Sequence, residues 1–189
     1  MPSSTEPGST AEPATETRAV ILVEGASDQR AVEVLAMLRG RDLAADGVAV
    51  VSMGGITNLS RHLDQLAPGV LVTGLYDRDE EAWVQRALAR RDAPVALQVC
   101  DRDLEDELIR ALGVAGALEV VEARGDSAAW AILCRQPFHR ARPADQVLHR
   151  FLGTTSGRKI EYAGLLTAAA YHRGCVPAPM DAVLTATAG

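Results

Sequence analysis

Short apolar runs alternate with amphipathic stretches along the first part of the chain. Four runs of strand length are each followed by a turn and then by a segment with apolar residues at helical spacing, and they cover residues 19–23, 48–52, 70–76 and 95–100. Strands that are largely apolar and separated by helices are typical of a parallel sheet covered on both faces. The pattern predicts an α/β fold with a central parallel four-stranded sheet flanked by helices.

The segments between these runs carry helix signals. Ser27 is the predicted N-cap of a helix that ends at Gly40. Further helices are predicted over about 58–66, from Asp79 to about Arg91 with a break at 92–94, and after the acidic segment 101–107. We expect a disordered tail over 1–18, an α/β domain over 19–115, and a mostly helical C-terminal part over 116–189 that packs on the same domain.

Composition narrows the function classes. Hydrophobic residues make up 48% of the chain but aromatics only 4%, so the core depends on Ala, Val and Leu. The net charge of −6 argues against a simple DNA-coating protein, although an acidic site neutralised by cations is compatible with it. Cys100, Cys134 and Cys175 are scattered and suggest neither a disulfide framework nor a zinc site. Without a membrane-length apolar run or a signal peptide, we expect a cytoplasmic protein.

Three carboxylates fall where predicted strands end. Glu24 follows the first strand, and Asp77 and Asp79 follow the third. The carboxyl ends of parallel strands meet at one edge of the sheet, and residues two apart in extended chain point the same way, which predicts that Asp77 and Asp79 lie side by side. Such oxygen ligands suit magnesium or manganese. Asp28 has two open interpretations, a charge at a helix N-terminus or a further metal ligand.

These residues resemble a known signature. Leu22-Val23-Glu24-Gly25-Ala26-Ser27-Asp28, followed by Tyr76-Asp77-Arg78-Asp79, is similar to the Toprim signature of topoisomerases, bacterial primases and nucleases of the OLD (overcoming lysogenisation defect) family. The first string is most similar to the OLD nucleases. Gly54-Gly55 with Asn58, and Asp103-Leu104-Glu105-Asp106, extend the resemblance over about residues 19–112.

The resemblance implies a Toprim-like (Rossmann-like) fold and a metal-dependent endonuclease that hydrolyses DNA with two Mg²⁺ or Mn²⁺ ions. One ion would be held by Glu24, Asp77 and Asp79, and the other by Asp28 and Glu105. Two ions about 4 Å apart activate the attacking water and stabilise the leaving oxygen. The acids around Glu105, namely Asp103, Asp106 and Glu107, are interpreted mainly as charges at a helix start.

Lys159 is the only lysine among 19 basic residues. OLD nucleases likewise have a late lysine on a helix near the metals, and the resemblance implies that Lys159 stabilises charge on the phosphoryl transition state. The alternative is chance in an arginine-rich composition.

Several alternatives stay open. OLD nucleases carry an ATPase domain before the Toprim domain, and residues 153–159 lack the spacing of a phosphate-binding loop, so the domain acts alone, works with a separately encoded ATPase, or has taken another task. The alternative to a nuclease is a non-catalytic or accessory Toprim module that works with a separate ATPase or nuclease partner. A receiver-like phosphoacceptor domain is disfavoured, because its paired acids follow the first strand.

A basic stretch in the C-terminal part also has two interpretations, a DNA backbone contact or a solvated helix surface. It contains Arg135, His139, Arg140, Arg142, His149 and Arg150. The four histidines of the chain show no metal-ligand spacing and no obvious carboxylate partner, and we expect them at the surface. The pattern does not determine an oligomeric state.

Overall fold

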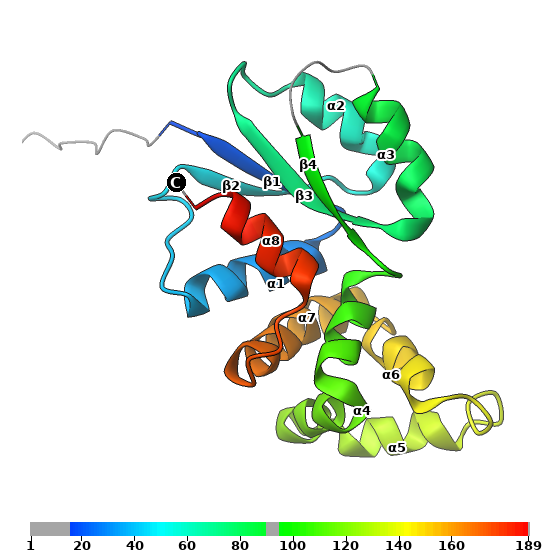
Figure 1. The fold of residues 1–189 in the computed structure, drawn as a ribbon. Helices are drawn as coiled ribbons and strands as arrows, with labels where there is room; N and C mark the ends of the chain where they lie inside the picture. Colours follow the sequence, from blue (N-terminus) through cyan, green and yellow to red (C-terminus); the bar gives the residue numbers. More distant parts are fainter. Residues whose placement is uncertain (1–15, 90–94, 189) are drawn as a thin grey trace, which may run out of the picture.

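The computed structural model describes residues 16–89 and 95–188. Within these ranges one sheet contains β1 (Ala19–Val23), β2 (Val48–Ser52), β3 (Leu71–Asp77) and β4 (Val95–Cys100). Every neighbouring pair of strands is parallel, and the order across the sheet is β2-β1-β3-β4 (Figure 1). The predicted α/β fold with a parallel four-stranded sheet is confirmed.

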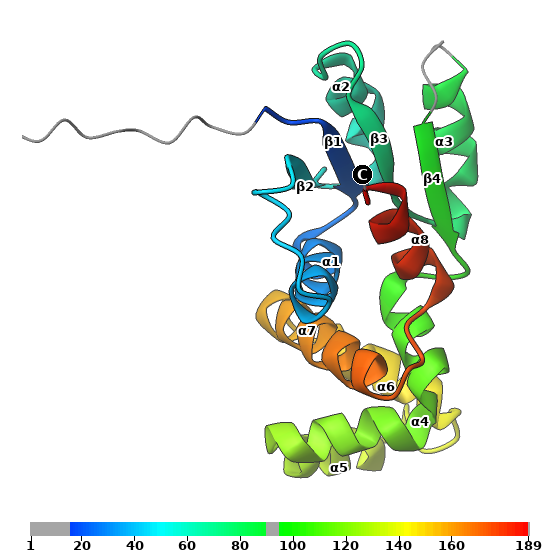
Figure 2. The same cartoon turned by 60° about the vertical axis from the view of Figure 1, so that its left-hand side comes forward.

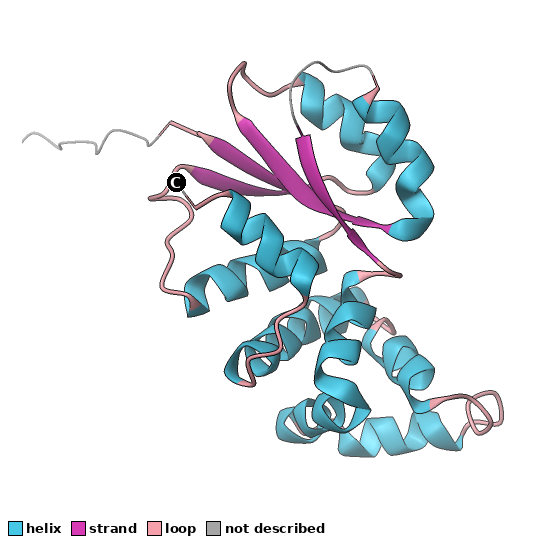
Figure 3. Cartoon of the chain, viewed as in Figure 1, coloured by secondary structure: helices cyan, strands magenta, loops and turns pink. Residues whose placement is uncertain are grey.

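Alternate residues of β1 build two cores, one on each face of the sheet. Ile21 and Val23 are buried in a cluster with residues of α1 (Ala26–Leu38) and α8 (Ala178–Ala186). Val20 and Leu22 are buried in a second cluster with residues of α2 (Leu59–Asp64) and α3 (Glu81–Leu88). Successive side chains of a strand point to opposite faces, so a strand that is apolar throughout needs helices on both sides, and Figure 3 shows them there.

Helix α1 is capped differently from the prediction. Its N-cap residue is Gly25, whose backbone N–H donates to Asp28 Oδ2 at 2.9 Å. Ser27 lies inside the first turn and is buried. The prediction of Ser27 as the N-cap was wrong because the Asp28 carboxylate, three residues after Gly25, satisfies the free backbone donor.

The two short helices on the second face are each preceded by a 3₁₀ turn. The turn η1 (Ile56–Asn58) leads into α2, and the turn η2 (Arg78–Glu80) leads into α3. Both helices end two or three residues before the predicted positions. The predicted break over 92–94 lies outside the described residues, as does most of the predicted disordered tail.

The chain after β4 is helical. It forms α4 (Leu104–Arg124), α5 (Ser127–Arg135), α6 (Ala144–Leu152), α7 (Ser156–His172) and α8, and α4 is kinked at Gly113, where φ is 68°. Helix α7 packs along α1, whereas α8 returns to the sheet against β3 and β4 (Figure 2). The division of the chain near residue 115 stays a prediction. Helix α4 runs through that point, and the C-terminal helices share one core cluster with β1.

None of the helices in the described ranges has the length and the apolar composition that crossing a membrane requires.

Candidate metal centre

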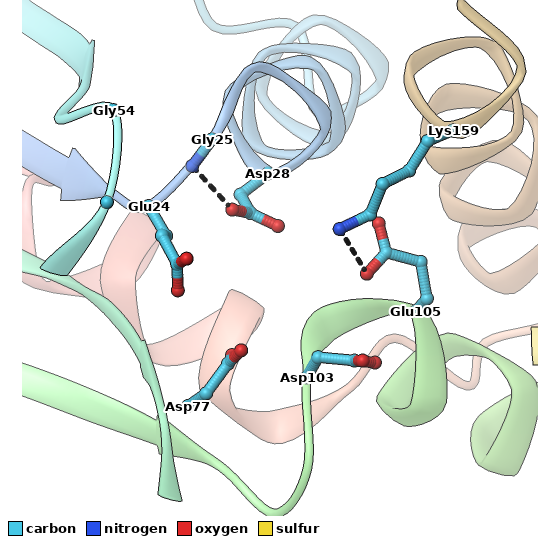
Figure 4. Close-up of a pocket in the computed structure, with 9 residues that line it drawn as sticks. Glu24, Gly25, Asp28, Gly54, Asp77, Asp103, Glu105 and Lys159 are labelled. Atoms are coloured by element: carbon cyan, nitrogen blue, oxygen red, sulfur yellow. Dashed lines mark hydrogen bonds and ion pairs between the residues drawn. The ribbon is translucent and has the colours of Figure 1, made fainter. Parts of the chain in front are cut away.

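Five carboxylates surround a pocket at the carboxyl edge of the sheet. Glu24 follows β1, Asp77 ends β3, Asp103 precedes α4, and Asp28 and Glu105 lie in the first turns of α1 and α4. The pocket has a volume of about 340 Å³, and Figure 4 shows these side chains around it. The remaining lining residues are Gly25, Gly54, Gly55 and Lys159. The structure thus brings together Glu24, Asp28, Asp77, Glu105 and Lys159 from five separate segments.

A glycine turn after β2 fixes the backbone of Glu24. The N–H groups of Gly54 and Gly55 donate to the Glu24 carbonyl oxygen at 3.0 and 3.2 Å. Both glycines have positive φ, 69° and 111°, a conformation that other residues rarely adopt. The Asn58 side-chain amide donates to the carbonyl oxygens of Met53 and Gly54 and closes the turn. The two glycines after β2, together with Asn58, therefore position the backbone of Glu24, which carries the first carboxylate of the pocket.

Asp28 combines the two roles that its sequence position suggested. One carboxylate oxygen accepts from Gly25 N–H, and the side chain also lines the pocket (Figure 4). Burial, together with the negative charges of Glu105 and Glu24, raises the pKa of Asp28 to about 6. The capping bond holds the carboxylate in place, while its neighbours make its negative charge unfavourable without a cation.

Asp77 has the most strongly raised pKa among these aspartates. Burial raises its pKa to about 8, and the negative charges of Glu24, Asp103, Asp28 and Glu80 add to the effect. Each neighbouring carboxylate makes ionisation of Asp77 less favourable, because like charges in a partly desolvated site repel. A bound cation reverses the sign of this interaction.

Glu105 and Lys159 form the only ion pair among the residues that line the pocket. The Lys159 Nζ atom lies 3.3 Å from Glu105 Oε2 (Figure 4). Glu105 is 4% exposed, and neither of its carboxylate oxygens has a hydrogen-bond partner, so the ion pair lacks hydrogen-bond geometry. Burial raises the pKa of Glu105 although Lys159 opposes the shift. Burial lowers the pKa of Lys159, but Glu105 and Asp28 outweigh it and the net shift is upward.

The donor set of the pocket fits a divalent cation. Its oxygens are those that Mg²⁺ or Mn²⁺ prefers, the carboxylates raise one another's pKa, and a buried carboxylate lacks hydrogen bonds. Within residues 16–89 and 95–188, no three Asp, Glu, His or Cys side chains lie close enough together to hold one ion. The carboxylates surround a space and do not meet at a single point.

Asp79 does not line this pocket. Strand β3 ends at Asp77, and the chain enters the 3₁₀ turn η2, which leaves the Asp79 side chain exposed. The prediction that Asp77 and Asp79 lie side by side was wrong because the alternation of an extended strand no longer applies beyond Asp77.

Glu80, which the sequence pattern did not single out, lies beside Glu24 in place of Asp79. Burial raises the pKa of Glu80 to about 7, and the charge of Glu24 and a hydrogen bond between the two carboxyl groups add to the shift. Glu80 Oε2 is buried without a hydrogen-bond partner. The acidic string after β3 was the only sequence signal for this residue, and the turn that orients it was not predicted.

Asp103 caps α4 and also pairs with a histidine from α6. Its Oδ1 accepts from the Asp106 N–H at 2.8 Å, and its Oδ2 lies 2.6 Å from His149 Nε2. Burial raises the pKa of Asp103, but the bonds from His149 and Asp106 outweigh it and the net shift is downward. The expectation that the histidines lack carboxylate partners and lie at the surface was wrong for His149, and His139 is buried.

The remaining acids at the start of α4 behave as predicted for a helix-start cluster. Asp106 and Glu107 form ion pairs with Arg110 at 3.1 and 2.6 Å and do not line the pocket. They stabilise the first turns of α4, which carries Glu105.

Metal binding should stabilise the protein more at pH 8 than at pH 6. The pKa values of Asp77, Glu80 and Asp28 lie at about 8, 7 and 6, above ordinary values of 3.8 to 4.5, so the folded protein holds protons that the unfolded chain releases. The protons held by these three carboxyl groups stabilise the folded state fully below about pH 4, and this stabilisation is lost as pH rises towards 8. We expect the melting temperature without metal to fall over this range, and saturating MgCl₂ to raise it by roughly 5–10 °C at pH 8.

Differential scanning fluorimetry at constant ionic strength measures this effect. NaCl at matched ionic strength is the control for screening, and EDTA defines the metal-free state. An equal rise at pH 6 and pH 8, or no rise with Mg²⁺ and Mn²⁺, would contradict the assignment of these carboxylates to a cation site.

Comparison with known proteins relates this parallel sheet, with its acidic pocket at the carboxyl edge, to one family. Residues 17–79 match the family model described as overcoming lysogenization defect protein-like, TOPRIM domain. This segment of the chain is therefore similar to an OLD-like Toprim domain.

Solved structures of similar fold extend over nearly the whole chain. The C-terminal region of the Burkholderia pseudomallei OLD protein is 20% identical, with a TM-score of 0.64, and the match covers 90% of this chain and 97% of that one. Two structures of the C-terminal region of the Xanthomonas campestris pv. campestris OLD protein are 21% and 23% identical, with TM-scores of 0.60 and 0.61. Each match covers 90% of this chain and 94% of the other. A search of curated proteins finds no significant match. The likeness shows that the helical C-terminal part belongs to the same fold as the OLD C-terminal regions.

Proposed function

We propose that this protein is a divalent-metal-dependent nuclease that hydrolyses phosphodiester bonds in DNA. The observation that supports the proposal is the pocket itself, in which five carboxylates and one lysine face a common space at the carboxyl edge of the sheet. Phosphodiesters are anionic and cannot approach this excess of negative charge without bound cations. The match of residues 17–79 to the OLD-like Toprim model is consistent with this chemistry.

In the proposed site, Glu24 and Asp77 bind one Mg²⁺ or Mn²⁺ ion, and Asp28 and Glu105 bind another. When bound, such ions supply an activated water and stabilise negative charge on the phosphate oxygens. Asp79 belongs to the proposed site through the sequence motif alone, since its exposed side chain lies outside the pocket.

Lys159 supplies the fixed positive charge of the proposed site. Its side chain is 42% exposed, so it is accessible from solvent while its ammonium group pairs with Glu105. A compact ammonium group can contact a phosphate oxygen as a point charge, whereas a planar guanidinium needs a wider approach. The role proposed for Lys159 is to stabilise negative charge that develops on the phosphate during cleavage.

A second candidate function is an accessory Toprim module that works with a separately encoded ATPase. The observation that favours it is the spread of the carboxylates, no three of which in the described residues meet around one point. In this case metal binding would remain, and cleavage would require the partner.

Plasmid cleavage tests the proposed function. Purified protein incubated with supercoiled plasmid and MnCl₂ should produce nicked or linear DNA, and EDTA should abolish the reaction. Lys159→Met should lower the rate by about 10²-fold, because it removes the one basic side chain that lines the pocket. Glu122→Gln, an exposed acid of α4 away from the pocket, is the matched control and should cleave at the wild-type rate.

Absence of cleavage by the wild-type protein with both Mg²⁺ and Mn²⁺ would overturn the proposal of a self-sufficient nuclease. Metal-dependent stabilisation in the same preparation would then favour the accessory module.

A further inference from the structure

The loop between α5 and α6 is a basic, aromatic projection on an acidic protein. Residues 135–143 contain three arginines and no acidic residue, whereas the whole chain has a net charge of −6. Every residue from Arg135 to Gln146 is exposed except His139. Figure 1 shows the loop projecting beyond the ends of the two helices that it joins. This local excess of positive charge gives the loop an electrostatic preference opposite to that of the whole chain.

Phe138 is the most prominent apolar side chain of the loop. It is 65% exposed, the highest value among the large hydrophobic residues described. The Arg142 guanidinium carbon lies 3.9 Å from the centre of its ring, and the buried His139 ring packs edge-on against it at 5.0 Å between ring centres. An aromatic face stacked with arginine is the combination that nucleic-acid-binding surfaces use to contact bases and phosphates together.

Hydrogen bonds within the loop order its backbone and one of its arginine side chains. The backbone N–H of His139 donates to the Gln136 carbonyl oxygen at 2.9 Å, and the backbone N–H of Arg142 donates to the His139 carbonyl oxygen at 3.1 Å. Arg140 Nε donates to the Arg135 carbonyl at 2.9 Å, which fixes its side chain across the loop. A loop ordered before binding loses less conformational freedom when a ligand docks, so its contacts contribute more to affinity.

Helix α6 connects the loop to the acidic pocket. It begins directly after the loop, and His149 near its C-terminal end lies 2.6 Å from Asp103 of the pocket. A helix of this length spans about 13 Å, which corresponds to about four nucleotides of one DNA strand. DNA with a phosphodiester at the pocket would therefore pass within reach of the loop.

We propose that this basic loop surface, defined by Arg135, Phe138, Arg140 and Arg142, docks the DNA that flanks the bond cut at the pocket. The arginines contact backbone phosphates, and Phe138 packs against a sugar or a base. The choice of DNA rests on the proposed function, whereas the location of the surface rests on its own charge and exposure. DNA is favoured over an acidic protein partner because α6 leads from this surface to a pocket suited to phosphodiester chemistry.

Fluorescence anisotropy with the full-length protein tests the surface separately from cleavage. The probe is a labelled duplex of about 20 base pairs in CaCl₂, with KCl varied, and gels verify that it stays intact. The double variant Arg140→Gln/Arg142→Gln should bind at least about tenfold more weakly, and its plot of log K against log salt concentration should be shallower by about 2. Phe138→Ala should weaken binding with an unchanged salt slope, because it removes no charge.

A matched control is available on the opposite side of the sheet. Arg86 stacks over the ring of Trp83 at 4.1 Å, and Trp83 is 49% exposed on α3. The variant Trp83→Ala/Arg86→Gln removes the same kind of cation–aromatic pair and should bind DNA as the wild type does.

The possible results separate this proposal from the proposed function. Loop variants that bind as tightly as wild type would overturn the docking surface even if plasmid cleavage is observed. Loop-dependent binding without any cleavage would support the surface and contradict the nuclease. If the wild-type protein binds no duplex even at low salt, the surface does not dock DNA, and a protein partner takes its place.

Discussion

Asp77→Asn should slow metal-dependent cleavage severely while leaving the metal-free protein at least as stable as the wild type. The substitution keeps the size of the side chain but removes the carboxylate that faces Glu24, Asp28 and Asp103 in the pocket. Loss of a metal ligand removes several kcal/mol of transition-state stabilisation, which corresponds to a rate lowered by roughly 10³-fold. At pH 8 and above, removing this charge also relieves repulsion, so the melting temperature without metal should not fall.

Two measurements on the same preparation distinguish this outcome from misfolding. The initial rate of plasmid cleavage should fall sharply, and the rise in melting temperature on adding Mg²⁺ should become smaller.

Asp79→Asn provides a comparison within the same motif. Because Asp79 lies outside the pocket, we expect a smaller loss than for Asp77→Asn. An equal loss would mean that η2 rearranges when metal binds.

Gly74→Ala should destabilise the fold more than any other glycine substitution outside the turns. A Cβ atom at this position in β3 would lie 2.1 Å from the Leu22 carbonyl oxygen of β1 and 3.0 Å from Leu97 Cδ2. The first contact is with backbone of the neighbouring strand, so no side-chain rotation relieves it. We expect a loss of about 3 kcal/mol or more, which lowers the melting temperature of a domain of this size by roughly 6–12 °C.

Gly157→Ala is the matched control for this prediction. A Cβ atom at Gly157 in α7 meets no atom within 4 Å, and alanine is the better helix former there. Thermal unfolding of the two variants should therefore move in opposite directions. A melting temperature of Gly74→Ala within about 2 °C of wild type would show that β1 and β3 can separate without cost.

The close contact between β1 and β3 at Gly74 also affects the geometry of the candidate metal centre. Leu22 and Gly74 are partners in the register of β1 and β3. Glu24 follows two residues after the first, and Asp77 three residues after the second. A wider separation of the strands would move these carboxylates apart, so Gly74→Ala should also weaken the stabilisation by Mg²⁺ in the fraction that folds.

The sheet was predictable from the sequence because its strands are largely apolar and are separated by segments with helical spacing. Each predicted strand lies within one residue of the observed bounds, since turn residues and helical segments mark where each mostly apolar run ends. The helix starts were harder to predict. Ser27 has the chemistry of an N-cap, but the Asp28 carboxylate at the third helical position performs the capping, and residue type alone does not rank the two.

The candidate site likewise contains residues whose positions were predictable from the sequence and residues whose positions were not. Glu24 and Asp77 were predictable because strand ends of a parallel sheet share one edge. Glu80 and the exposed position of Asp79 depend on the 3₁₀ turn η2, which has no periodic signal in so short a segment. The His149–Asp103 pair joins residues 46 positions apart on different helices, and only the packing of α6 against α4 brings them together.

The pocket draws on residues spread from Glu24 to Lys159, and this has a consequence for the chain during its synthesis. A ribosome that has released only the four strands has exposed Glu24 and Asp77 but not Lys159. The emerging chain therefore lacks the one cation that the pocket contains, and it also lacks α8, which covers β3 and β4. The pocket therefore cannot contain its full set of side chains until the chain has been synthesised beyond Lys159 and α7 has packed against α4.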